Sequence, residues 1–246
     1  MNFLTDALIQ PILTCGVELM LWNAIFTHGA GRDSFAGYSK EAYFSYVLWA
    51  VFIGRIAVNW MYENRMMSCI ERGELNTILL RPISFYEVYF SQFFAYKSLI
   101  AGISLLFPLG ISVYYGLPII YSRLPEMLLM LAVYIWFCYS MSFIVSTFSF
   151  FFTKASSFSF IKNITLVFFT GELFPLDLLP GHIKAIFLQL PFPCAVYAPV
   201  GYLSGRIDSS LFYHCFGRLF LGLAVTHTIG FYLWKRGLRE YAGTGA

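Results

Sequence analysis

Apolar residues along the chain are gathered into runs of about 20 residues, and shorter polar segments separate these runs. An α-helix of about 20 apolar residues crosses the hydrocarbon core of a bilayer. A helix also satisfies its own backbone hydrogen bonds, which lipid cannot do. The pattern therefore predicts an all-α integral membrane fold with six transmembrane helices, over residues 7–26, 43–62, 93–115, 127–150, 158–174 and 212–234.

Composition agrees with this pattern. Of the 246 residues, 59% are hydrophobic and 12% are charged, whereas an ordinary soluble domain carries roughly 25% charged residues. The chain is therefore predicted to be a single membrane domain over residues 1–246. Its net charge of +3 is small and its basic residues are scattered, so nucleic acid is not an expected partner.

Lysine and arginine are unevenly divided between the two sides of the membrane that these spans define. Cytoplasmic loops usually carry the excess of these residues. A cytoplasmic N-terminus puts the larger group inside, which predicts that both termini are cytoplasmic. The inner group is Arg65, Arg72, Arg81, Lys154, Lys162, Lys235, Arg236 and Arg239, and the outer group is Arg32, Lys40, Arg123, Lys184 and Arg206.

The connection 63–86, on the predicted cytoplasmic side, is amphipathic and too polar to span. Gly73 permits a bend between two short helices, and Pro82 ends the second. Such an element is expected to lie at the membrane surface. Its apolar face consists of Met66, Met67, Ile70, Leu75, Ile78 and Leu79, and its charges are Glu63, Arg65, Glu71, Arg72 and Glu74.

The outer connection 174–206 is rich in proline and contains apolar stretches too short to cross, such as 183–190. Short apolar runs of this kind are typical of re-entrant or interfacial segments. The pattern predicts a hairpin that dips back into the helix bundle from outside.

Two ionisable residues, Glu18 and Arg55, fall inside predicted spans. Each costs about 2.5–3.5 kcal/mol at the centre of a membrane helix on insertion scales. Adjacent antiparallel spans would let them pair. They are candidates either for a polar pathway through the membrane or for a structural ion pair.

The sequence lacks the common motifs of nucleotide hydrolysis and of metalloprotease active sites. It has no phosphate-binding loop and no HExxH motif, so the chain is not expected to hydrolyse ATP or to bind a metal. Its four histidines and five cysteines have no metal-ligand spacing. A stand-alone secondary transporter or channel stays open as an alternative, and a membrane-embedded enzyme is less well supported.

Three motifs resemble those of ABC-2-type transporter permeases. Segment 70–82 (IERGELNTILLRP) resembles the cytoplasmic element between the second and third spans of that family. Segment 171–180 (GELFPLDLLP) resembles the entry to its re-entrant outer hairpin, and residues 191–201 resemble the continuation. The tail 234–241 (WKRGLREY) is similar to that of one subgroup. The N-terminal interfacial helix of many such permeases would be reduced here to residues 2–8.

The resemblance implies a fold like that of the type V exporters, with segment 63–82 as the helix that couples the permease to a separate ATPase. An outer gate would be formed by Gly171, Phe174, Pro175 and Pro180. The coupling residues would be Arg72, Gly73, Glu74, Leu75, Leu79, Arg81 and Pro82.

The resemblance to ABC-2-type permeases also implies partners and a location. Two ABC ATPase subunits would bind ATP and Mg, and this chain would bind no cofactor. A second permease, identical or homologous, would complete a dimer in the plasma (inner) membrane of a prokaryote. The expected function is export of a hydrophobic or amphipathic substrate.

Overall fold

The computed structural model describes residues 5–28, 34–35, 37–57 and 62–241, and these residues are predominantly helical. A π-helical segment (Thr5–Ile9) leads into α1, and 3-10 turns cover Tyr121–Arg123, Phe148–Phe150, Leu176–Leu178 and Phe192–Cys194. Strands β1 (Ser34–Phe35) and β2 (Tyr38–Ser39) pair antiparallel, with Ser34 opposite Ser39. The helices are α1 (Gln10–His28), α2 (Lys40–Ala57), α3 (Glu63–Glu71), α4 (Leu75–Leu79), α5 (Phe85–Ser104), α6 (Leu106–Tyr115), α7 (Leu124–Thr147), α8 (Ser156–Phe169), α9 (Gly181–Phe187), α10 (Tyr197–Leu203) and α11 (Ser209–Glu240).

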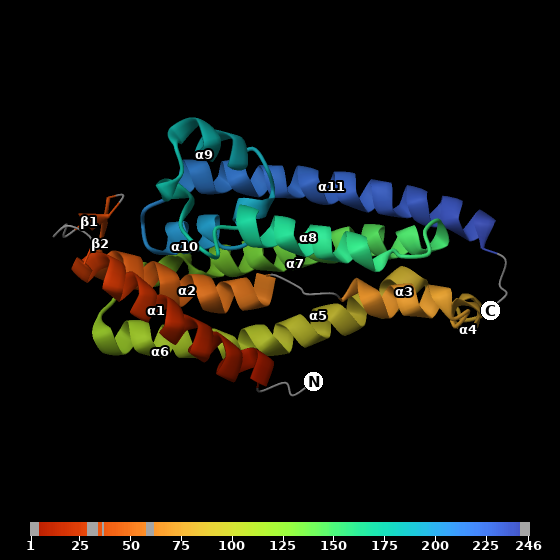
Figure 1. The fold of residues 1–246 in the computed structure, drawn as a ribbon, viewed down its shortest axis with the longest axis horizontal. Helices are drawn as coiled ribbons and strands as arrows, with labels where there is room; N and C mark the ends of the chain where they lie inside the picture. The colour runs from red at the N-terminus through yellow and green to blue at the C-terminus, as the bar shows by residue number, and fades with distance from the viewer. Residues whose placement is uncertain (1–4, 29–33, 36, 58–61, 242–246) are drawn as a thin grey trace.

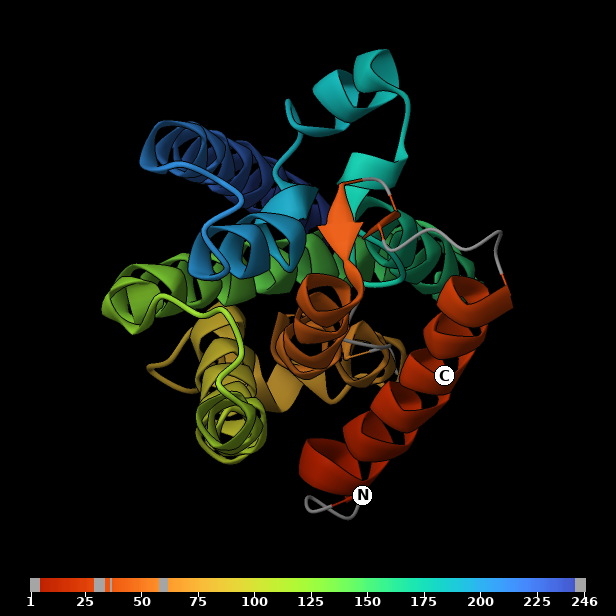
Figure 2. The same ribbon diagram turned by 90° about the vertical axis from the view of Figure 1, so that its left-hand side faces the viewer.

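The helices form an elongated bundle whose two ends differ. Helices α3 and α4 lie at one end, while α9, α10 and the β1–β2 pair lie at the opposite end (Figure 1). Viewed from the second end, α2 lies near the middle and α1 at the edge of the bundle (Figure 2). Helix α2 is buried on nearly all sides. This position suits its sequence, because a helix that is apolar on most of its faces packs in the interior.

Among the described residues, four helical stretches are long and apolar enough to cross a membrane. They are Ala7–Thr27, Phe85–Tyr115, Tyr121–Phe150 and Ser209–Glu240. They correspond to the first, third, fourth and sixth predicted spans. The other two predicted spans correspond to shorter helices, α2 with 18 residues and α8 with 14. The second predicted span, 43–62, includes residues 58–61, which lie outside the described residues. The count of six spans stays a prediction.

Two helices have bounds that differ from those of the predicted spans. The third span was placed from residue 93, but α5 begins at Phe85, because Ser84 and Glu87 form a capping box there. The fifth was extended to residue 174, but α8 ends at Phe169. Gly171 follows with a φ of 82°, a left-handed conformation that favours glycine and ends a helix.

The stretch formed by α5 and α6 is broken near Leu105. Pro108 lies just beyond the break and is buried. A proline has no N–H to donate, and its ring clashes with the carbonyl group four residues earlier, here that of Ser104. The sequence therefore places a bend within this span.

Candidate functional site: the α3–α4 element and the outer segment

Segment 63–82 forms two short helices joined at a bend, as the sequence predicts. Gly73 has a φ of 75°, and its N–H donates to the carbonyl of Ile70 at 3.3 Å. The carbonyl of Gly73 then accepts from the N–H of Asn76 at 3.2 Å. Because this φ favours glycine, Gly73 fixes the direction in which α4 leaves α3.

The two helices bury one face and expose the other. Met66, Ile70 and Leu75 are buried, so this part of the predicted apolar face is confirmed. Leu79, on the same predicted face, is 48% exposed. Helix α4 lies at one end of the molecule (Figure 1) and packs against α5.

The exposed charges line a groove between α3, α4 and α5. Its volume is about 560 Å³, and Tyr89 and Gln92 contribute to it from α5. Three arginines and one glutamate give it a positive balance. Arg72, Glu74 and Arg81, which the sequence singles out, are thus brought together around one cavity with Arg65.

A buried ion pair joins α3 to α8. The Nζ atom of Lys162 lies 2.6 Å from Oε2 of Glu63 and 3.0 Å from Oγ of Ser142. The side chains of Lys162 and Glu63 are 2% and 0% exposed. Lys162, which the sequence places in the inner group and within the fifth predicted span, is therefore buried inside the bundle. Helix α8 turns its polar face into the bundle and its apolar face, with Phe160 and Ile164, outward.

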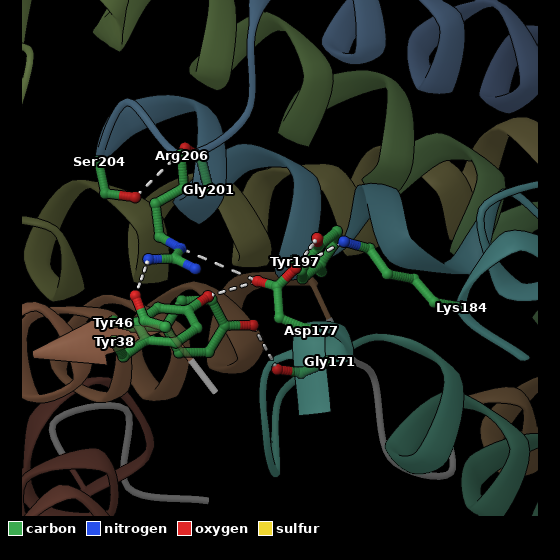
Figure 3. Close-up of polar contacts among 10 residues, drawn as sticks. Tyr38, Tyr46, Gly171, Asp177, Lys184, Tyr197, Gly201, Ser204 and Arg206 are labelled. Carbon is green, nitrogen blue, oxygen red and sulfur yellow. Dashed lines mark hydrogen bonds and ion pairs between the residues drawn. The ribbon is translucent and has the colours of Figure 1, made fainter. Parts of the chain in front are cut away.

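At the opposite end of the molecule lies the predicted outer connection, residues 174–206, which we call the outer segment. Asp177 holds this segment in place (Figure 3). Its Oδ1 atom accepts from Lys184 Nζ at 2.6 Å and from the hydroxyl of Tyr197 at 2.8 Å. Its Oδ2 atom accepts from the hydroxyl of Tyr38 at 2.7 Å. Tyr38 belongs to β2, so the carboxylate joins the outer segment to the chain that enters α2.

Arg206 reinforces the same connection. Its Nε atom lies 3.9 Å from Oδ2 of Asp177, and its Nη1 donates to the carbonyl of Gly37 at 3.0 Å. Its guanidinium carbon lies 3.5 Å from the ring centroid of Tyr38, a cation–π contact. One carboxylate therefore faces two cations and two tyrosine hydroxyls.

Gly171 is the second point at which the outer segment is fixed. Its carbonyl accepts from the hydroxyl of Tyr46 at 2.7 Å. A Cβ atom placed on it would lie 2.8 Å from Cβ of Tyr197, closer than side chains pack. Only glycine fits between α2 and the residue that starts α10.

The predicted gate residues lie in this region but in different surroundings. Pro175 is buried, Phe174 is half-buried and Pro180 is exposed just before α9. Sequence reasoning missed Asp177, although it lies within the quoted motif. An aspartate inside an otherwise apolar, proline-rich stretch was the available signal.

The pKa of Asp177 is lowered from the ordinary value of an aspartate. Burial acts to raise this pKa, but the hydrogen bonds from Lys184, Tyr38 and Tyr197 favour the carboxylate and together outweigh burial. A carboxyl group with a depressed pKa in the folded state stabilises the protein above its unfolded pKa of about 3.9. That stability is lost as the pH falls through the folded value.

We therefore expect the stabilisation by Asp177 to be constant from about pH 8 to about pH 5 and to disappear only below about pH 4. The measurement is the difference in thermal unfolding midpoint between the wild type and Asp177→Asn in mild detergent, at a series of pH values. A difference that is already lost at about pH 6 would contradict the depressed pKa.

Of the two ionisable residues predicted inside spans, Arg55 has a described polar contact. Its Nη2 atom donates to Oε1 of Gln10 at 2.5 Å, so it bridges α2 to the start of α1. Glu172 lies close to the same region, because a Cβ atom on Gly54 would fall 2.5 Å from its carboxyl carbon. The pairing of Glu18 with Arg55 stays a prediction.

The arrangement defines a class of protein: a predominantly helical, multi-pass membrane protein with an amphipathic charged element at one end and a tethered segment at the other. A family model described as "ABC-2 family transporter protein" matches residues 12–245. The chain therefore belongs to the ABC-2 family of transporter proteins. No match to a curated protein was found. Membership makes this chain the membrane permease of an ABC transporter, a transport component that works with an ABC ATPase.

Proposed function

We propose that this permease exports a hydrophobic or amphipathic molecule, and that the α3–α4 element couples it to its ATPase. The observation that carries the coupling role is the convergence of Arg72, Glu74 and Arg81 on one groove at the end of the bundle. Exposed charges around a cavity suit a protein partner with complementary charges. The buried face of the same element packs on the helices that would have to move.

The buried Glu63–Lys162 pair offers a route for that movement. It connects the first residue of α3 to the middle of α8 at 2.6 Å. A displacement of α3 by an ATPase would be transmitted to α8, because separating two buried charges is costly. Helix α8 leads directly to Gly171 and the outer segment.

The outer segment would act as the exit gate. Asp177 and Gly171 attach it to β2 and α2 through the hydroxyls of Tyr38 and Tyr46. Opening would require these contacts to break or to move as a unit. A re-entrant position in the membrane is part of this proposal.

The proposed assembly contains six spans per permease, a second permease that is identical or homologous, and two ATPases. The ATPases would bind ATP and Mg and shift the permeases between inward-closed and outward-closed states. Both termini and α3–α4 would be cytoplasmic, and the membrane would be the plasma membrane of a prokaryote.

The test is copurification with the ATPase after co-expression in mild detergent. Exchange of the charges in a variant carrying Arg72→Glu and Glu74→Arg is expected to lower the recovered ATPase at least about tenfold, equivalent to about 1.4 kcal/mol of binding free energy. Exposed residues are changed, so the permease should keep its yield and particle size. Equal recovery from wild type and variant would refute the coupling role.

A matched control exchanges two charges elsewhere at the same end of the molecule. Arg236 and Glu240 form an exposed ion pair at 3.6 Å on α11, and exchanging them preserves the pair. ATPase recovery should match the wild type. If no ATPase copurifies even with the wild type, a stand-alone transporter becomes the better interpretation.

A further inference from the structure

An apolar groove separates α1 from α6 and is open within the membrane-spanning part of the molecule. Its volume is about 450 Å³. Residues from three helices line it, and none of the lining residues is charged. They include Ile12, Cys15 and Leu19 of α1, Leu48 of α2, and Phe107 and Ile111 of α6.

The groove exists because of the local sequence on both sides. Gly16 lines it from α1, and a Cβ atom on this glycine would meet nothing within 4 Å. Helix α6 follows the break at Leu105, and α1 packs along α2. In the view of Figure 2, α1 and α6 accordingly lie on either side of α2.

Helix α6, which forms one wall of the groove, is about as long as half of the hydrocarbon core of a bilayer. Helix α6 has 10 residues, which gives a length of about 15 Å, and the hydrocarbon core is about 30 Å thick. At the far end of α6, Tyr114 and Tyr115 are 81% and 71% exposed. Exposed tyrosines are typical of the membrane–water interface, so the groove extends from the interface towards the middle of the bilayer.

We propose that this groove binds one acyl chain of a membrane phospholipid, in the leaflet on the side of α10. The groove is continuous with side chains that face outward on both helices, such as Leu13 and Val113, which are 65% and 69% exposed. Water would find few hydrogen-bonding partners there, whereas a hydrocarbon chain would contact apolar side chains on three sides. The proposal does not depend on the transport function proposed above.

The experiment uses the full chain in vesicles of phosphatidylethanolamine and phosphatidylglycerol that contain a phospholipid with a diazirine in its acyl chain. After illumination, labelled peptides are mapped by mass spectrometry. We expect labelling of α1 and α6 at the groove residues in the wild type. Gly16→Trp fills the groove and should lower this labelling about fivefold, and Gly16→Leu should have a smaller effect.

The matched control is Gly110→Trp on α6. Gly110 is exposed, is not part of the groove, and also has nothing within 4 Å of an added Cβ atom. It should leave labelling of the groove unchanged. Equal labelling in Gly16→Trp and wild type would overturn the proposal.

Two other occupants give distinct results, and each would overturn the phospholipid assignment. If a second copy of the chain covers the groove, the groove peptides stay unlabelled in the wild type and Gly16→Trp converts dimers to monomers by native mass spectrometry. If the groove instead binds the hydrocarbon chain of a transported molecule, labelling of the groove in the complex with the ATPase falls when ATP and Mg are added.

Discussion

Replacement of Lys162 by methionine is expected to lower the free energy of unfolding by about 3–5 kcal/mol, because it leaves the charge of Glu63 buried without a partner. The Glu63 side chain is fully buried, and the ion pair at 2.6 Å is its described charged contact. The measurement is the thermal unfolding midpoint and the yield of monodisperse protein in mild detergent. A wild-type midpoint would contradict the importance of this pair.

The double variant Glu63→Met, Lys162→Met is the informative control. Buried pairs replaced by apolar side chains of similar volume are often neutral in stability, so the double variant should recover most of the loss. If it is as unstable as Lys162→Met alone, the loss comes from packing around α8 and not from an unpaired charge. A stable double variant also tests coupling: the ATPase should still bind, but its hydrolysis should no longer drive transport.

Replacement of Asp177 by asparagine is expected to cost about 2 kcal/mol, the order of a hydrogen bond to a charged group. The change keeps the shape of the side chain but leaves Lys184 and Arg206 facing each other without the carboxylate. The tether between the outer segment and β2 should loosen. Thermal unfolding in detergent and hydrogen exchange of residues 174–206 measure the two effects.

Asp208→Asn is the matched control for this prediction. Asp208 lies at the same end of the molecule as Asp177, where its Oδ1 atom accepts from the N–H of Leu211 at 3.1 Å and caps α11. Asparagine caps a helix as well as aspartate does, so stability should hardly change. Equal losses in the two variants would mean that the charge of Asp177 has no special role.

The pattern of the sequence by itself determined that this is a membrane protein. It also predicted the four long apolar helical stretches and the bent α3–α4 element. These features depend on local properties: a run of apolar residues, a glycine that permits a positive φ and a proline that ends a helix. The proposed coupling residues Arg72, Glu74 and Arg81 could be singled out because a motif of 13 residues contains them.

Tertiary structure alone decided which distant residues meet. Glu63 and Lys162 are 99 positions apart, and Tyr38 and Asp177 are 139 apart. Local periodicity gives the face of a helix on which a charge lies, but not the helix that packs against that face. The sequence therefore predicts neither the partner of Lys162 nor the role of Asp177, because the burial of a charge depends on the partner that packing brings to it.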